Sequence, residues 1–160
     1  MSMDWATTAV TVVTSSLASG FVTFLLNARQ QERSVKREKL ELLCGLLHKQ
    51  HARFAGMTRL ANQALAGPAD LKAYQDFMAE SARENDIAHE KVVALIAIYF
   101  PTLKPKFDAA ARAGWAATGA AGMAKQVKQF EALTACHQGV YRAAIELGPT
   151  VNAPLWKFWK

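Results

Sequence analysis

The sequence lacks the alternation of apolar and polar residues that marks amphipathic β-strands, and it lacks turn-rich repeats. Long segments with helical periodicity stand in their place, and they are interrupted where proline or glycine occurs. This pattern argues against a sheet in any layer of the fold. We therefore predict an all-α fold class.

Cysteine is also scarce, and no cofactor motif accompanies it. Cys44 and Cys136 are the only two cysteines, and we expect both to be free thiols in a reducing compartment. Cys44, His48 and His51 fall at i, i+4 and i+7 on one helical face, a spacing that metal ligands can have. Because no fourth ligand lies nearby, the sequence predicts neither a metal nor a cofactor.

Charged residues are missing between Asp4 and Arg29. As a helix, residues 5–26 would span about 33 Å, enough to cross a hydrocarbon core of about 30 Å. Serine and threonine make this run less apolar than a leucine-rich anchor. A cleaved signal peptide fits poorly, because residues 1–4 contain no Lys or Arg and carry an acid. We predict a transmembrane helix that continues without a break into the next helix.

Small and hydroxyl-bearing residues gather on one side of this run when it is placed on a helix. Small residues let a second helix approach closely, whereas lipid cannot satisfy hydroxyl groups. We therefore predict self-association through this face, either as a packed helix bundle or as the lining of a pore. A plain anchor whose hydroxyls bond to their own backbone is the alternative. The predicted face comprises Thr7, Thr11, Thr14, Ser15 and Ser19.

Basic residues follow the run directly, at Arg29, Arg33, Lys36 and Arg37. The positive-inside rule places their side of the membrane in the cytoplasm, and attraction to anionic headgroups explains them without nucleic acid. The predicted topology is single-pass in a bacterial inner membrane. Residues 1–4 form the extracytoplasmic end, and the C-terminus is cytoplasmic.

Residues 27–150 are long enough for one compact domain. Its first helix should run to about Ala66, with Gln50 as the one polar position of an apolar seam, and three more helices should cover about 70–99, 106–117 and 123–147. We predict a cytoplasmic four-helix antiparallel bundle whose most buried part is residues 92–100. The seam residues are Leu40, Leu43, Leu47, Phe54, Met57, Ala61 and Leu65.

The tail, residues 151–160, is dense in aromatic and basic residues. Trp156 and Trp159 suit the headgroup region, where indole rings concentrate, so they are predicted membrane-surface contacts together with the bases below the run. Two alternatives stay open. Trp156 and Phe158 could pack as a lid on the bundle, or the tail could contact a partner protein.

Arg83 and His89 lie six positions apart within the second predicted helix. This pair resembles the spaced Arg and His signature of the HEPN superfamily, whose helical domains dimerise so that paired Arg and His residues act on RNA. The resemblance implies that His89 would move protons and Arg83 would stabilise phosphate charge. A surface ion-pairing Arg and a partly buried helix His are the structural alternative.

The whole layout resembles a second group. An N-terminal membrane helix, a basic junction and a small helical domain with an Arg and His pair are similar to the pore-forming accessory proteins of type VI-B CRISPR systems. That resemblance implies an oligomeric membrane effector in phage defence. The layout is also similar to that of many small bacterial membrane proteins, including the sequence of residues 98–101.

Three functional classes follow from these patterns. The favoured one is a membrane-anchored helical protein that acts by self-association or by recruiting a protein partner, and is not an enzyme. The second is an oligomeric membrane-pore effector. The third is a membrane-tethered ribonuclease, in which Arg83 and His89 are catalytic and RNA is the partner.

Overall fold

The structure is a computed structural model that describes residues 5–67, 71–118 and 122–153. For residues 5–18, 82–87, 115, 117 and 118 it describes the backbone alone. Every regular element in these ranges is helical, which confirms the all-α prediction. The elements are α1 (Trp5–Ala66), α2 (Leu71–Tyr99), the 3₁₀ helix η2 (Pro101–Leu103), α3 (Lys104–Thr118), α4 (Met123–Glu146) and α5 (Gly148–Val151).

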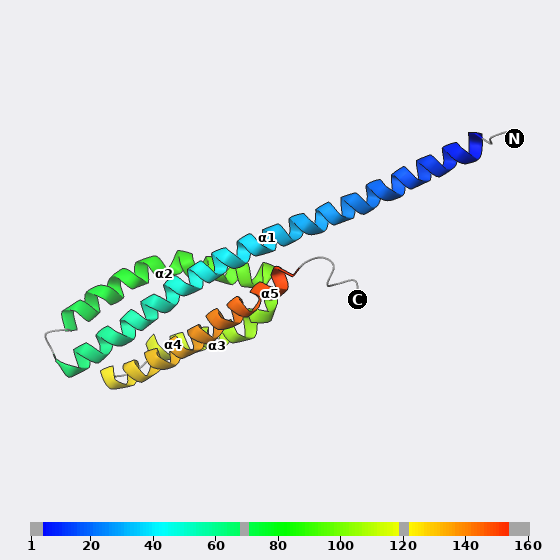
Figure 1. Cartoon of the computed structure of the whole chain (residues 1–160). Helices are drawn as coiled ribbons and strands as arrows, with labels where there is room; N and C mark the ends of the chain where they lie inside the picture. The colour runs from blue at the N-terminus through cyan, green and yellow to red at the C-terminus, as the bar shows by residue number, and fades with distance from the viewer. Residues whose placement is uncertain (1–4, 68–70, 119–121, 154–160) are drawn as a thin grey trace.

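Helix α1 is one continuous element of 62 residues, about 93 Å long at the usual helical rise. Its C-terminal half packs within the bundle, and its N-terminal part projects far beyond the other helices (Figure 1). The predicted continuity between the uncharged run and the seam is therefore correct. The helix ends at Ala66, and the N–H of the next residue, Gly67, donates to the Gln63 carbonyl at 3.0 Å.

The four long helices run alternately up and down, so that consecutive helices are antiparallel (Figure 1). Helix α1 packs against both α2 and α4, and α3 packs against α4. The centre of the bundle is therefore the α1–α4 pair. Helix α2 packs on the α1 side of this pair and α3 packs on the α4 side. The predicted helix boundaries differ from the observed ones by no more than a few residues, because proline and glycine punctuate the chain between helices.

The apolar core confirms most of the predicted seam. Leu43 and Leu47 are fully buried, and burying such a side chain stabilises the fold by roughly 1.5–3 kcal/mol. Leu65 departs from the prediction, since it is 51% exposed near the end of α1. The residues of the core cluster nearer the projecting part of α1 include Leu40, Val92, Ile96, Phe100, Leu103, Phe107, Val140 and Ala144.

Residues 92–100 were predicted to be the most buried part of the bundle, but they are buried on one side only. Val92 and Ile96 are buried, whereas Val93 is 43% and Ile98 is 70% exposed. The reason is geometric: α2 makes its main helix contact with α1 alone, so the opposite side of α2 faces outward. Burial was predicted from the length of the apolar run. The exposure of a residue in this run depends instead on how many helices pack against α2.

Among the described residues, no helix combines the length and the apolar character needed to cross a membrane. Most of the predicted transmembrane run falls in residues 5–18, whose side chains lie outside the description.

Candidate functional site

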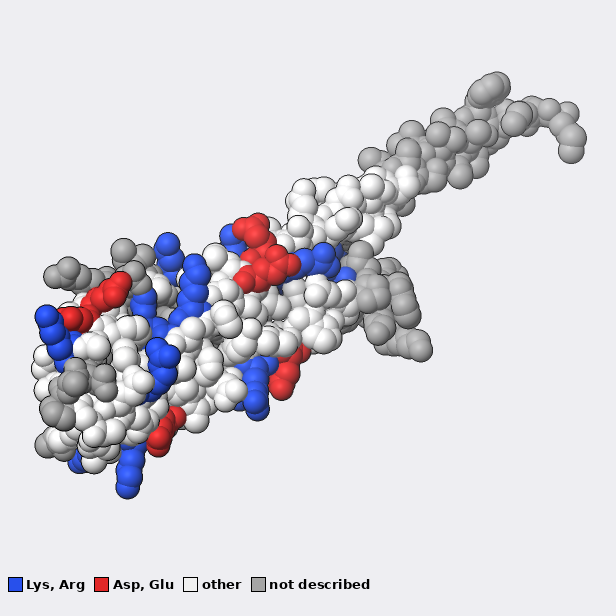
Figure 2. Space-filling view, turned by 60° about the vertical axis from the view of Figure 1, so that its left-hand side comes forward, with Lys and Arg blue, Asp and Glu red and all other residues white. Residues whose placement is uncertain are grey.

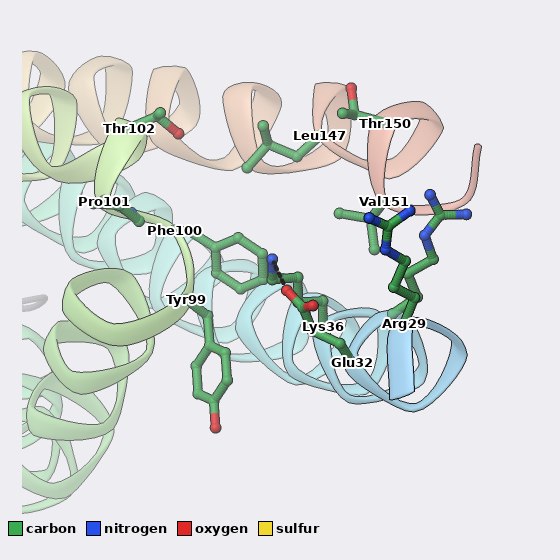
Figure 3. A pocket seen from close by; sticks show the side chains of 11 residues that line it. Arg29, Glu32, Lys36, Tyr99, Phe100, Pro101, Thr102, Leu147, Thr150 and Val151 are labelled. Carbon is green, nitrogen blue, oxygen red and sulfur yellow. Dashed lines mark hydrogen bonds and ion pairs between the residues drawn. The ribbon is translucent and has the colours of Figure 1, made fainter. Parts of the chain in front are cut away.

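A cleft of about 610 Å³ lies at the end of the bundle from which α1 projects (Figure 3). Three segments that are distant in sequence meet there: two successive turns of α1 (residues 29–36), the α2–η2 junction, and the α4–α5 junction. We refer to it as the junction cleft. It is lined by Arg29, Glu32, Arg33, Lys36, Tyr99, Phe100, Pro101, Thr102, Leu147, Thr150 and Val151.

The charged side of the junction cleft comes from α1. Arg29, Glu32, Arg33 and Lys36 share one face because their spacing is i, i+3, i+4 and i+7. Lys36 Nζ lies 2.7 Å from Glu32 Oε1. The hydrogen bond and charge of Lys36 lower the pKa of the Glu32 carboxyl, and the charges of Arg29 and Arg33 lower it further. Glu32 is therefore an ionised partner within a basic group.

The C-terminal segment is fastened to the same turns of α1. Arg33 Nη1 donates to the Ala153 carbonyl at 2.8 Å, and Arg37 Nε donates to Asn152 Oδ1 at 2.7 Å. Both bonds span more than one hundred residues of sequence, so they hold α5 beside α1. Two of the bases that were predicted to meet lipid thus also have an intramolecular role, which their sequence position did not predict.

The apolar side of the junction cleft comes from Phe100, Leu147 and Val151. Phe100 is buried, and Pro101 starts η2 directly after it, closed by the bond from Leu103 N–H to the Phe100 carbonyl at 2.9 Å. On the other side, Val151 N–H bonds the Leu147 carbonyl at 2.9 Å, which continues the path of α4 into α5. Two helix ends therefore form an apolar wall opposite a basic one.

Next to the junction cleft, α1 leaves the bundle with apolar side chains in the open. Phe21 is 62% exposed and Phe24 is 66% exposed, and Val22, Leu25 and Leu26 are exposed as well. In Figure 2 the described part of this projection carries no Lys, Arg, Asp or Glu, whereas the bundle surface carries both signs of charge. An uncharged apolar helix thus joins a charged bundle at the bases of the junction cleft.

The predicted hydroxyl face lies largely outside the described side chains. Of its residues only Ser19 is described, and it is exposed. Its carbonyl accepts a bond from Thr23 Oγ1 at 2.9 Å. A threonine that bonds back to its own helix satisfies its hydroxyl without water, as the plain-anchor alternative expects. Self-association and pore lining through Thr7, Thr11, Thr14 and Ser15 stay predictions.

The predicted catalytic pair is only partly described. The Arg83 side chain lies outside the description. His89 is exposed, and its ring stacks on Phe107 with the centroids 5.5 Å apart and the planes at 30°. A role for either residue in RNA cleavage stays a prediction, as does the membrane contact of Trp156 and Trp159, which lie outside the described residues.

The spacing of Cys44, His48 and His51 does not produce a metal site in the described part of the chain, where no three His, Cys, Asp or Glu residues are grouped to hold an ion. Burial raises the pKa of the half-buried Cys44 thiol, which favours the neutral form over a metal-binding thiolate. His48 instead packs at a tilt against Tyr141, with the ring centroids 5.8 Å apart.

One buried polar pair connects α1 to α4. His137 Nε2 lies 3.0 Å from Gln50 Oε1, and each residue is only 3% exposed. The His137 ring also meets Phe54 edge-on at 5.1 Å between centroids. Burial, with smaller contributions from the charges of His51 and His89, lowers the pKa of His137 to about 4. The sequence predicted Gln50 as the polar position of the seam, but missed its partner.

His137 could have been found from its spacing, since it lies seven residues after Phe130 and three before Val140, both on the predicted inward face of α4. The junction cleft had no such local signal, because its walls come from three separate segments. No protein family matches this chain, and no curated protein or solved structure is significantly similar to it, so its function has to be argued from this geometry.

Proposed function

We propose that the protein is anchored in a membrane by the projecting part of α1 and that its bundle acts beneath the membrane by self-association or partner recruitment. The observation that carries the proposal is the exposed apolar group Phe21, Val22 and Phe24 on a helix that extends far beyond the bundle. Exposed large apolar patches mark surfaces that meet a membrane or another molecule.

The energetics favour lipid as the environment of this segment. Each large apolar side chain gains roughly 1.5–3 kcal/mol when it leaves water, and several such side chains follow one another along one short segment. No described residue from position 19 to position 28 carries a charge that would oppose insertion. A backbone in helical form already satisfies its own hydrogen bonds, which is the condition for entering a hydrocarbon layer.

The bases of the junction cleft support an orientation with the bundle in the cytoplasm. Arg29 follows Leu26 by three residues, so its Cα lies about 4.5 Å further along the helix axis. Lys and Arg directly beside a membrane segment are typical of its cytoplasmic side. The bundle would then sit against the inner leaflet, with the end that contains the junction cleft toward the lipid.

The proposal does not make the protein an enzyme. The buried His137 is tied to Gln50 and held neutral, and the exposed His89 is stacked on Phe107. A rigid bundle at the end of a long helix is suited to presenting a surface at a fixed position near the membrane.

Alkaline carbonate extraction of membranes that contain the full chain tests the anchor. We expect the wild-type protein to stay in the membrane pellet and the double variant F21D/F24D to leave it. Aspartate costs about 2.5–3.5 kcal/mol at the centre of a membrane helix. Phe21 and Phe24 lie nearer the end of the run at Leu26, so each substitution should cost less than this, but the two together still oppose insertion. The matched control V93D/I98D puts two carboxylates on exposed apolar positions of the bundle and should leave retention unchanged.

Release of the wild-type protein by carbonate would contradict the anchor. Equal release of the two double variants would also contradict it, because the effect would then follow the added charge and not its position.

A further inference from the structure

We propose that the junction cleft binds one anionic phospholipid through the phosphate of its headgroup. The inference rests on the membrane anchor proposed above and names the ligand of the site that the anchor brings to the membrane surface. Three features carry it: the charge of the cleft, its mixed lining, and its distance from the apolar part of α1.

The charge of the cleft suits an anion. Arg29, Arg33 and Lys36 face it with a single acid, Glu32, which leaves a net of two positive charges. Glu32 is already bonded to Lys36 at 2.7 Å, and this contact lowers the pKa of its carboxyl. Arg29 on α1 and Val151 on α5 line the same cleft (Figure 3). A guanidinium in such a position can bind a phosphate through two parallel hydrogen bonds.

The rest of the lining suits a lipid better than a free phosphate ion. A volume of about 610 Å³ lies in the range of roughly 300–1,000 Å³ that small-molecule pockets have. Phe100, Leu147 and Val151 form an apolar wall that a glycerol backbone and the first methylene groups of an acyl chain would cover. Thr102 and Thr150, both exposed at the rim, add hydroxyl groups for the polar part of the headgroup.

The position of the cleft along α1 matches the depth of lipid phosphates. If Leu26 lies at the edge of the hydrocarbon, Arg29 and Arg33 lie about 4.5 Å and 10.5 Å beyond it. The polar headgroup layer on each side of a bilayer is about 5–8 Å thick. Both guanidinium groups, with their long side chains, can therefore reach the layer of phosphates without moving the bundle.

Native mass spectrometry of the full chain, released from mild detergent with equal amounts of phosphatidylglycerol and phosphatidylcholine, tests the proposal. We expect one phosphatidylglycerol molecule per chain to be retained about tenfold over phosphatidylcholine, which corresponds to one strong charged contact. Equal retention of the two lipids would overturn the proposal.

Two pairs of variants locate the binding. T102E puts a carboxylate at the rim of the junction cleft, and Q138E adds the same charge at an exposed position of α4. K36Q removes a lysine that is paired with Glu32 inside the cleft, and K39Q removes one that is paired with Glu38 outside it. T102E and K36Q should each lower phosphatidylglycerol retention several-fold, while Q138E and K39Q should not. Equal losses within a pair would overturn the assignment to the cleft.

A competition experiment distinguishes the phosphate of a lipid from a free phosphate. Glycerol phosphate and inorganic phosphate, each added in excess, should leave the lipid in place, because they lack the apolar part that meets Phe100 and Leu147. Displacement by either would overturn the lipid assignment in favour of a free phosphate. Carbonate extraction keeps the two proposals apart: if the protein stays in the membrane but shows no lipid preference, the cleft inference fails and the anchor stands.

Circular dichroism and the melting temperature of each variant show that its bundle is folded. Thr102 is exposed in η2 and lies outside both core clusters, so T102E should melt within a few degrees of the wild-type protein. A loss of lipid by a variant that melts normally supports the proposal, and normal retention by such a variant overturns it.

Discussion

The two ends of α1 have similar apolar residues and opposite surroundings. Leu43 and Leu47 are fully buried between α2 and α4, whereas Phe21 and Phe24 on the same helix are 62% and 66% exposed. The chain itself supplies the partner helices for the first pair. The second pair has no partner within the described chain, and under the proposed anchor lipid would cover it. Helical periodicity is similar in the buried and the projecting parts of α1. The absence of charged residues before Arg29 is the feature of the sequence that distinguishes the projecting part.

L47A and F24A each remove a large apolar side chain from α1, one from the core and one from the projection. L47A leaves a cavity in the core and should lower the free energy of unfolding of the bundle by about 2–5 kcal/mol. F24A removes a larger side chain from the projection and should leave that free energy unchanged. Urea denaturation in mild detergent, followed by the helical signal, measures both. Similar losses in the two variants would show that Phe24 packs against the bundle.

Acid pH should affect the buried end of α1 through His137. Because burial lowers the pKa of this residue to about 4, it stays neutral in the folded state, whereas in the unfolded chain it gains a proton near pH 6.5. The unfolded state therefore binds more protons between these values. Stability should fall as the pH drops from 6.5 to 4, by up to about 3 kcal/mol, and should not respond to His137 above pH 6.5.

Two variants identify the source of that pH dependence. H137L removes the titrating group but leaves the amide of Gln50 buried without its partner, at a cost of about 1–3 kcal/mol. The double variant Q50L/H137L removes both polar groups and should recover most of this loss. Unfolding measured at pH 7 and pH 5 should show no contribution from position 137 in either variant. A pH dependence that persists in both would assign it to other groups.

Substitutions of the two arginines that bind the C-terminal segment should change stability less than substitutions in the core. R33Q replaces the guanidinium that donates to Ala153, and R37Q replaces the one that donates to Asn152. Each change should cost the C-terminal segment about 1 kcal/mol of local stability, because one hydrogen bond to the chain is lost. Amide hydrogen exchange at Val151 and Asn152 should become faster, while exchange in the core around Leu43 stays slow. Unchanged exchange at Val151 would contradict this role.

The sequence predicted the regular elements well because their signals are local. Gly67-Pro68, Phe100-Pro101 and Gly148-Pro149 mark helix ends that the structure has within a residue or two. The seam of α1 was predicted from its spacing, including Gln50. The exposed side of α2 at Ile98 was not predicted. Exposure there depends on how many helices surround α2, and the sequence of one segment does not contain that number.

The junction cleft could not be predicted for the same reason. Arg29 and its neighbours were visible as a basic face, but no local pattern indicated that Phe100 and Val151 would face them. Arg29 and Phe100 are 71 residues apart and Phe100 and Val151 are 51 apart, and the antiparallel path of the four helices returns all three to one end. The bases were therefore assigned to lipid alone, although Arg33 and Arg37 also hold the C-terminal segment.

The smallest expected effect concerns the hydroxyl face of the projection, predicted from Ser15 and Ser19. Small residues let two helices approach closely, and hydrogen bonds of polar side chains between membrane helices contribute about 0.6–2 kcal/mol. S15L/S19L should therefore shift the subunit number in mild detergent toward the monomer, as measured by light scattering. V22L/L26V, which changes only the shape of exposed apolar residues, should not shift it. If S15L/S19L keeps the wild-type subunit number, then self-association does not use this face. The exposed apolar side of α2 at Val93 and Ile98 then becomes the surface to test, because Ile98, at 70%, is the most exposed large apolar side chain among the described residues of the bundle.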